Sequence, residues 1–89
     1  MIARMWEVRA AAPQHVDALI DWLRDTALPS IESADHHVHS DLYRSMDRVV
    51  VISTWLKRPE DLPEPPPRLV ARPPHAWNFT PVERETPAQ

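Results

Sequence analysis

The chain has 89 residues, enough for one domain, and a domain this small buries only about 60% of the surface that its unfolded chain exposes. It has no cysteine for disulfides, and it has no glycine, which excludes the glycine-rich loops that hold nucleotide phosphates. A formal net charge of −3 without a basic run argues against a nucleic-acid partner. No apolar run is long enough for a membrane span or a signal peptide, so we expect a cytoplasmic protein.

A strand and a helix are predicted first. Residues 2–9 alternate as a strand does and place four side chains on one side: Ile2, Arg4, Trp6 and Val8. Pro13 suits the first turn of a helix, and apolar residues recur at helical spacing over residues 16–27. Pro29 should break or kink this helix, because it removes a hydrogen bond and crowds the preceding turn.

Two further strands are predicted to form a hairpin. Residues 37–44 alternate between polar and apolar side chains, and residues 48–55, RVVVISTW, are short, apolar and β-branched. Residues 45–47 supply the turn between them. Because residues 48–55 are apolar on both faces, we expect this strand to lie centrally in the sheet.

A proline-rich segment follows the hairpin. Residues 57–75 hold seven of the eleven prolines, and each proline inside a helix costs about 3 kcal/mol. We therefore expect an ordered, irregular arm that packs on the domain through Leu62, Leu69 and Val70. A mobile linker of polyproline-II type is the alternative.

The predicted elements form one domain over residues 1–83. Residues 75–82 resume as a last strand, and residues 84–89 are predicted to be a flexible tail. The order is an α+β, ferredoxin-like βαββ(α)β pattern in which the arm replaces the second helix.

This order resembles the antibiotic biosynthesis monooxygenase family of dimeric α/β barrels, which includes small haem-degrading enzymes. The matching segments are WEV in the first strand, LP late in the helix, LYRS in the second strand, VVVISTW in the third and AWNFTPVE in the last. The resemblance implies a homodimer whose sheets meet, and a ligand cavity between the sheet and the helices of each protomer.

The chain also departs from the family. The arm stands where members have the second helix that closes the cavity. Trp55 matches a tryptophan that the haem-degrading members use, but Arg4 replaces their asparagine and no residue matches their iron-binding histidine. We therefore expect no cofactor, with haem or a transition metal as open alternatives.

Residues 34–45, ADHHVHSDLYRS, carry three of the five histidines. On a strand, His37 and His39 would project to one side about 6.5–7 Å apart, and such a pair can bind a transition metal. Asp41 continues that face as a third ligand or as an orienting carboxylate. A partly exposed strand face and a dimer interface are the alternatives.

The four tryptophans are candidates for a ligand pocket. In one interpretation they are core and interface residues. In the other interpretation, Arg4 and the tryptophans bind a planar apolar ligand. The four tryptophans are Trp6, Trp22, Trp55 and Trp77. Oxygenation of that ligand without a cofactor would need a base and a hydrogen-bond donor, which His75, Tyr43 and Asn78 could supply.

The sequence therefore predicts a small homodimeric protein that binds an apolar or aromatic small molecule. Whether it is an enzyme stays open, and the expected chemistry would be that of a monooxygenase-like oxidoreductase. The alternatives are a non-catalytic binding or accessory protein, and a metal-binding module that uses His37 and His39.

Overall fold

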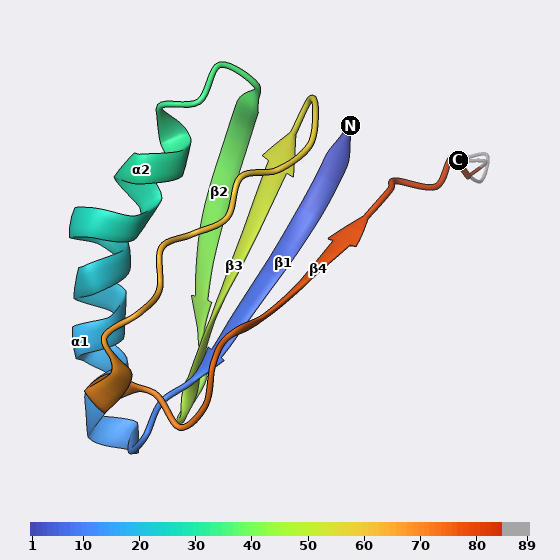
Figure 1. Ribbon diagram of the computed structural model, residues 1–89. Helices are drawn as coiled ribbons and strands as arrows, with labels where there is room; N and C mark the ends of the chain where they lie inside the picture. The colour runs from blue at the N-terminus through green and yellow to red at the C-terminus, as the bar shows by residue number, and fades with distance from the viewer. Residues whose placement is uncertain (85–89) are drawn as a thin grey trace, which may run out of the picture.

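The computed structural model describes residues 1–84, which form a four-stranded antiparallel sheet with a helical layer on one face (Figure 1). The strands are β1 (Ile2–Arg9), β2 (His37–Arg44), β3 (Arg48–Trp55) and β4 (His75–Phe79), in the spatial order β2-β3-β1-β4. The α+β, ferredoxin-like prediction is confirmed, and the first three strands have the predicted bounds. The last strand ends at Phe79, earlier than predicted. Of the predicted tail, residues 85–89 lie outside the described residues.

One helical segment, residues 13–32, lies across the inner face of the sheet. It consists of the 3-10 turn η1 (Pro13–His15), α1 (Val16–Trp22), the π-helical turn η2 (Leu23–Ala27) and α2 (Leu28–Glu32). The segment continues through Pro29, because the irregularity expected there is taken up by η2, where the Leu28 N–H bonds to the Leu23 carbonyl. A wider turn relieves the clash that a proline ring causes in a regular α-helix. No helix within residues 1–84 is long and apolar enough to cross a membrane.

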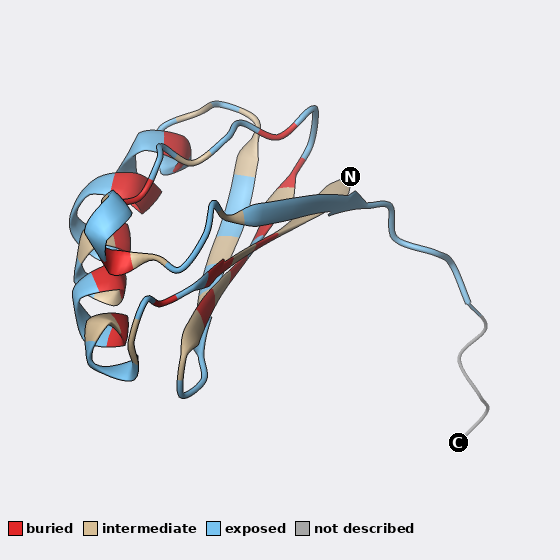
Figure 2. Cartoon of the chain, turned by 60° about the horizontal axis from the view of Figure 1, so that its bottom comes forward, coloured by how far each residue is buried: buried red, intermediate tan, exposed pale blue. Residues whose placement is uncertain are grey.

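The core lies between this helical segment and the inner face of the sheet (Figure 2). β1 contributes its even-numbered residues and β3 its odd-numbered residues, since paired positions share a face. The largest fully buried side chains are Trp55, Leu19, Leu23, Ile31, Val8, Val16, Val49 and Val51. Full burial of one such aliphatic side chain stabilises the fold by about 1.5–3 kcal/mol.

The arm runs over the inner side of the sheet beside the helical segment (Figure 1). Its one regular element is the 3-10 turn η3 (Pro67–Leu69). Leu69 is 3% exposed and belongs to the core, and Leu62 and Val70 pack against it. Two backbone hydrogen bonds of 2.9 Å fix the C-terminal end of the arm. They run from Ala11 N to Leu69 O and from Ala71 N to Arg9 O. The arm is therefore packed, as expected, and is not a free linker.

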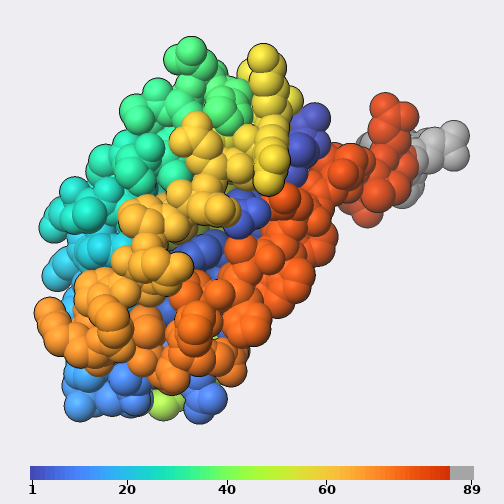
Figure 3. Space-filling view, viewed as in Figure 1, coloured from blue at the N-terminus to red at the C-terminus, as the bar shows by residue number. Residues whose placement is uncertain are grey.

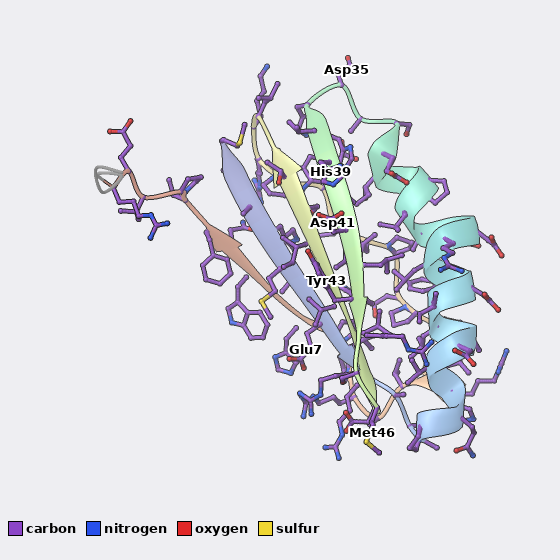
Figure 4. All side chains as sticks on the ribbon, turned by 180° about the vertical axis from the view of Figure 1, so that it is seen from behind. Glu7, Asp35, His39, Asp41, Tyr43 and Met46 are labelled. Carbon is purple, nitrogen blue, oxygen red and sulfur yellow. The ribbon has the colours of Figure 1, made fainter. Side chains whose placement is uncertain are left out.

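The outer face of the sheet is covered by neither the helical segment nor the arm (Figure 4). On this face, odd-numbered residues of β1 pair with even-numbered residues of β3 on one side and with odd-numbered residues of β4 on the other. The apolar side chains that gather there are Met5, Tyr43, Val50, Ile52, Trp77 and Phe79, and we call this set the outer apolar face.

A packed arm predicts a specific stability difference between two leucines. Replacement of the buried Leu69 by Ala should lower the free energy of unfolding by about 2–4 kcal/mol, because it removes buried methyl groups and leaves a cavity. Leu56→Ala is the matched control, since Leu56 is 61% exposed, and it should cost less than about 0.5 kcal/mol. Urea unfolding at one protein concentration measures both, and equal small losses would contradict the packed arm.

Candidate functional site

The arm and the sheet line an open cavity of about 180 Å³, which we call the arm cavity. Its lining residues are Arg4, Trp6, Asp61, Leu62, Pro63, Glu64, Pro73, Pro74 and Ala76. Figure 3 shows this region as a hollow in which blue atoms of β1 are visible between the gold arm and orange β4. β1 thus supplies the floor of the cavity and the arm supplies much of its wall.

Arg4 is the cation of the arm cavity, and its even position on β1 directs it to the inner face. Its side chain is 18% exposed. Nη1 donates a hydrogen bond of 2.8 Å to Oδ1 of Asn78, the residue opposite Arg4 on β4. Nη2 donates to the carboxylate of Asp61 on the arm. One guanidinium therefore connects the sheet to the arm.

Trp6 supplies the apolar surface of the cavity. It is 6% exposed, and its ring centroid lies 6.4 Å from that of Trp22, with 35° between the ring planes. Trp22 comes from the end of α1 and supports Trp6 without lining the cavity. The structure thus brings together four predicted site residues: Arg4, Trp6, Trp22 and Asn78.

Three other predicted site residues lie on the outer face of the sheet. Tyr43 is on β2, and His75 and Trp77 are on β4, where odd-numbered residues face outward. The rings of His75 and Trp77 stack with centroids 5.8 Å apart. The base and the hydroxyl donor expected for catalysis therefore face away from the arm cavity.

Trp55 has a core position. It is fully buried, and its Nε1 donates a hydrogen bond of 2.8 Å to Oγ of Ser53. The rings of His36 and His37 lie against it, with centroids at 5.2 and 5.1 Å. Trp55 does not line the arm cavity, so its surroundings match the core interpretation of the tryptophans.

The predicted common face of His37 and His39 is wrong. A β-bulge pairs His37 with Trp55 and His39 with Thr54, so the two imidazoles lie on opposite faces of the sheet. His39 Nε2 instead contacts Asp41 Oδ1 at 2.9 Å (Figure 4). Among residues 1–84, no three or more His, Asp or Glu side chains are grouped so that they could hold a metal ion. A metal-binding module stays a prediction from the sequence alone.

Asp61 is the site residue that sequence reasoning missed. It lies 57 positions from Arg4, in a segment whose prolines gave no helical or strand spacing from which to place a side chain. Only the path of the arm brings its carboxylate to the cavity. The sequence offered one weak signal, namely that an inward-facing arginine on a strand requires a counter-charge.

Three solved structures share the fold of this chain. Rv0793 from Mycobacterium tuberculosis has 17% identity and a TM-score of 0.68, over 96% of this chain and 98% of that one. A monooxygenase from the gene ActVA-Orf6 of Streptomyces coelicolor, solved with the ligand nanaomycin D, has 15% identity and a TM-score of 0.70, over 98% and 92%. NE2512 from Nitrosomonas europaea, a protein of unknown function, has 14% identity and a TM-score of 0.68, over 99% and 95%.

No protein-family profile and no curated protein sequence matches the chain. The structural likeness agrees with the resemblance to the antibiotic biosynthesis monooxygenases that the segments of the sequence suggested. At identities of 14–17%, what the likeness establishes is a common fold.

The core position of Trp55 can be tested through its hydrogen bond. Ser53→Ala leaves the buried indole N–H without its acceptor and should lower the free energy of unfolding by about 1–3 kcal/mol. Ser45→Ala, in the exposed turn between β2 and β3, should change it by less than about 0.5 kcal/mol. Unchanged stability of the Ser53 variant in urea unfolding would contradict this role of Trp55.

Proposed function

We propose that the protein binds an apolar or aromatic small molecule in the arm cavity. The observation that carries the proposal is that Trp6 and Arg4 line the same cavity, where a hydrogen bond from Arg4 to Asn78 fixes the guanidinium. Ligand pockets typically combine apolar walls with a few fixed polar groups that orient the ligand. The likeness to a monooxygenase solved with nanaomycin D supports a ligand site in this fold.

The size of the arm cavity limits the ligand or requires the arm to move. Ordinary ligand pockets have volumes of about 300–1,000 Å³, and the arm cavity has about 180 Å³. A second cavity of about 320 Å³ shares Glu64, Pro73 and Pro74 with it. Residues 60, 61, 63 and 64 are exposed between the buried Pro59 and Pro65, so their displacement would lose little buried area beyond the contact of Leu62 with the core. Such a displacement would admit a larger ligand.

Binding without catalysis is the function that the residues favour. His75 and Tyr43 face away from the cavity, and Asn78 already accepts a hydrogen bond from Arg4. Monooxygenase-like chemistry is the second candidate, and the likeness to the Streptomyces coelicolor enzyme favours it. The expectation of no cofactor, with haem or a transition metal as the alternatives, stays a prediction from the sequence. The cytoplasmic location also stays a prediction.

We also propose that two copies associate through the outer apolar face. Four of its large side chains, Tyr43, Ile52, Trp77 and Phe79, are exposed. Aromatic residues are enriched at protein interfaces, and an exposed apolar patch commonly marks one. The small buried interior of a chain of 89 residues adds a reason for association.

Ligand binding in the arm cavity can be tested by filling it. Ala76 is exposed and lines the cavity, so Ala76→Leu should obstruct it and weaken binding of anthrone, a planar aromatic probe, at least about tenfold. Ala71→Leu, an exposed alanine of the arm outside the lining, should leave the affinity unchanged. Tryptophan fluorescence measures the affinities.

Two outcomes of the anthrone titration would count against the proposal. Equal affinity of the wild type and the Ala76 variant would place the ligand elsewhere, and a wild type that binds no anthrone would remove this ligand class. Formation of anthraquinone faster than in protein-free buffer would favour the oxygenase candidate over binding alone.

The proposed dimer predicts sensitivity to charge on the outer apolar face. Ile52→Glu places a carboxylate in the centre of that face and should convert a dimer to a monomer in sedimentation velocity. Met46→Glu, in the exposed turn between β2 and β3 (Figure 4), should leave the dimer intact. A wild type that sediments as a monomer at micromolar concentration would contradict the proposal.

A further inference from the structure

We propose that the ligand of the arm cavity is an aromatic carboxylic acid, whose carboxylate binds Arg4 in place of Asp61. This inference rests on the proposed function and adds the chemical class of the ligand. In the structure described above, the Asp61 carboxylate occupies the position that the ligand's carboxylate would take.

The first argument is the charge of Arg4. An arginine side chain keeps its positive charge in proteins, and a largely buried charge is costly unless it is paired. Arg4 is 18% exposed, and within residues 1–84 Asp61 is the carboxylate that pairs with it. The cavity therefore contains a fixed cation that requires an anion next to it.

The second argument is the weak hold of Asp61. Its side chain is 83% exposed, and the contact with Arg4 Nη2 is made through one carboxylate oxygen, Oδ1. An ion pair with so exposed a partner contributes little to stability, because water and salt screen it. Release of Asp61 into water would therefore cost the protein little.

The third argument is what a ligand would gain. Asn78 fixes the guanidinium through Nη1, and the hydrogen bonds to Asn78 and Asp61 engage only part of the five-donor fork of Arg4. A carboxylate inside the cavity could accept two parallel hydrogen bonds from that fork, whereas Asp61 accepts through one oxygen. Its aromatic ring would lie against Trp6, which lines the same cavity.

A variant of Glu64 is the control that distinguishes the displacement of Asp61 from a general effect of negative charge on ligand affinity. Glu64 is exposed and lines the cavity, but its carboxylate makes no ion pair with Arg4 among the described residues. Asp61→Asn and Glu64→Gln each remove one negative charge from the cavity rim. Only the first removes the group that the ligand must displace.

The test compares 2-naphthoate with its neutral analogue 2-naphthamide by titration calorimetry. The wild type should bind the acid at least about fivefold more tightly than the amide. Asp61→Asn should raise the affinity for the acid about tenfold and leave the amide unchanged, whereas Glu64→Gln should raise it about twofold or less. Arg4→Gln should abolish the preference, and Arg4→Lys, which keeps the charge without the fork, should reduce it.

Other results of the calorimetry would contradict the inference, the displacement of Asp61 or the proposed function. Equal binding of the acid and the amide, in the wild type and the Asp61 variant, overturns the inference and leaves the proposed binding function standing. Equal gains in the Asp61 and Glu64 variants overturn the displacement. Absence of binding by both probes in all the variants overturns the inference and the proposed function together. Asp61 is exposed, so its variant decides the question even if the Arg4→Gln protein does not fold.

Discussion

The packing of a proline-rich arm on the inner face of the sheet is the constraint on which the site depends. One helical segment covers part of that face, and the arm packs beside it, near β1 and β4. An irregular segment in contact with a core leaves backbone N–H groups without partners, and proline has no N–H to satisfy. Seven prolines within residues 57–75 therefore allow a segment without helix or strand ladders to lie against the domain.

The path of the arm produces both the cavity and its charge arrangement. The burial of Leu69 and the backbone hydrogen bonds to Arg9 and Ala11 fix the C-terminal end of the arm. Residues 60–64 lie nearer the surface, and Asp61 among them pairs with Arg4. The outer apolar face has no comparable cover. The two faces of one sheet therefore have separate proposed roles, ligand binding on the inner face and association on the outer.

Much of the fold could be predicted from the sequence, because the signals are local. The alternation in β1 and β2 and the β-branched run of β3 gave the correct bounds of these strands. The bulge after His37 could not be predicted from alternation, since it depends on pairing with β3, and it alone separated the two histidines of the metal hypothesis. The turn η2 similarly depends on how the helix adapts to Pro29.

The site could be predicted only in part. The alternation of β1 correctly put Arg4 and Trp6 on one face, and Asn78 joined them because β4 pairs with β1. His75 and Tyr43 were assigned to the site by residue type, without a register to say which way they face. Asp61 carried no pattern at all, because irregular structure gives no period from which to infer a side-chain direction.

The position of the ligand is tested most directly by nuclear magnetic resonance of the four indole N–H groups during titration with 2-naphthoate. We expect the Trp6 signal and the backbone amides of residues 61 and 62 to shift, while the signals of Trp55 in the core and Trp77 on the outer face stay in place. Shifts confined to Trp77 and its neighbours on the outer face, with Trp6 unchanged, would contradict the account.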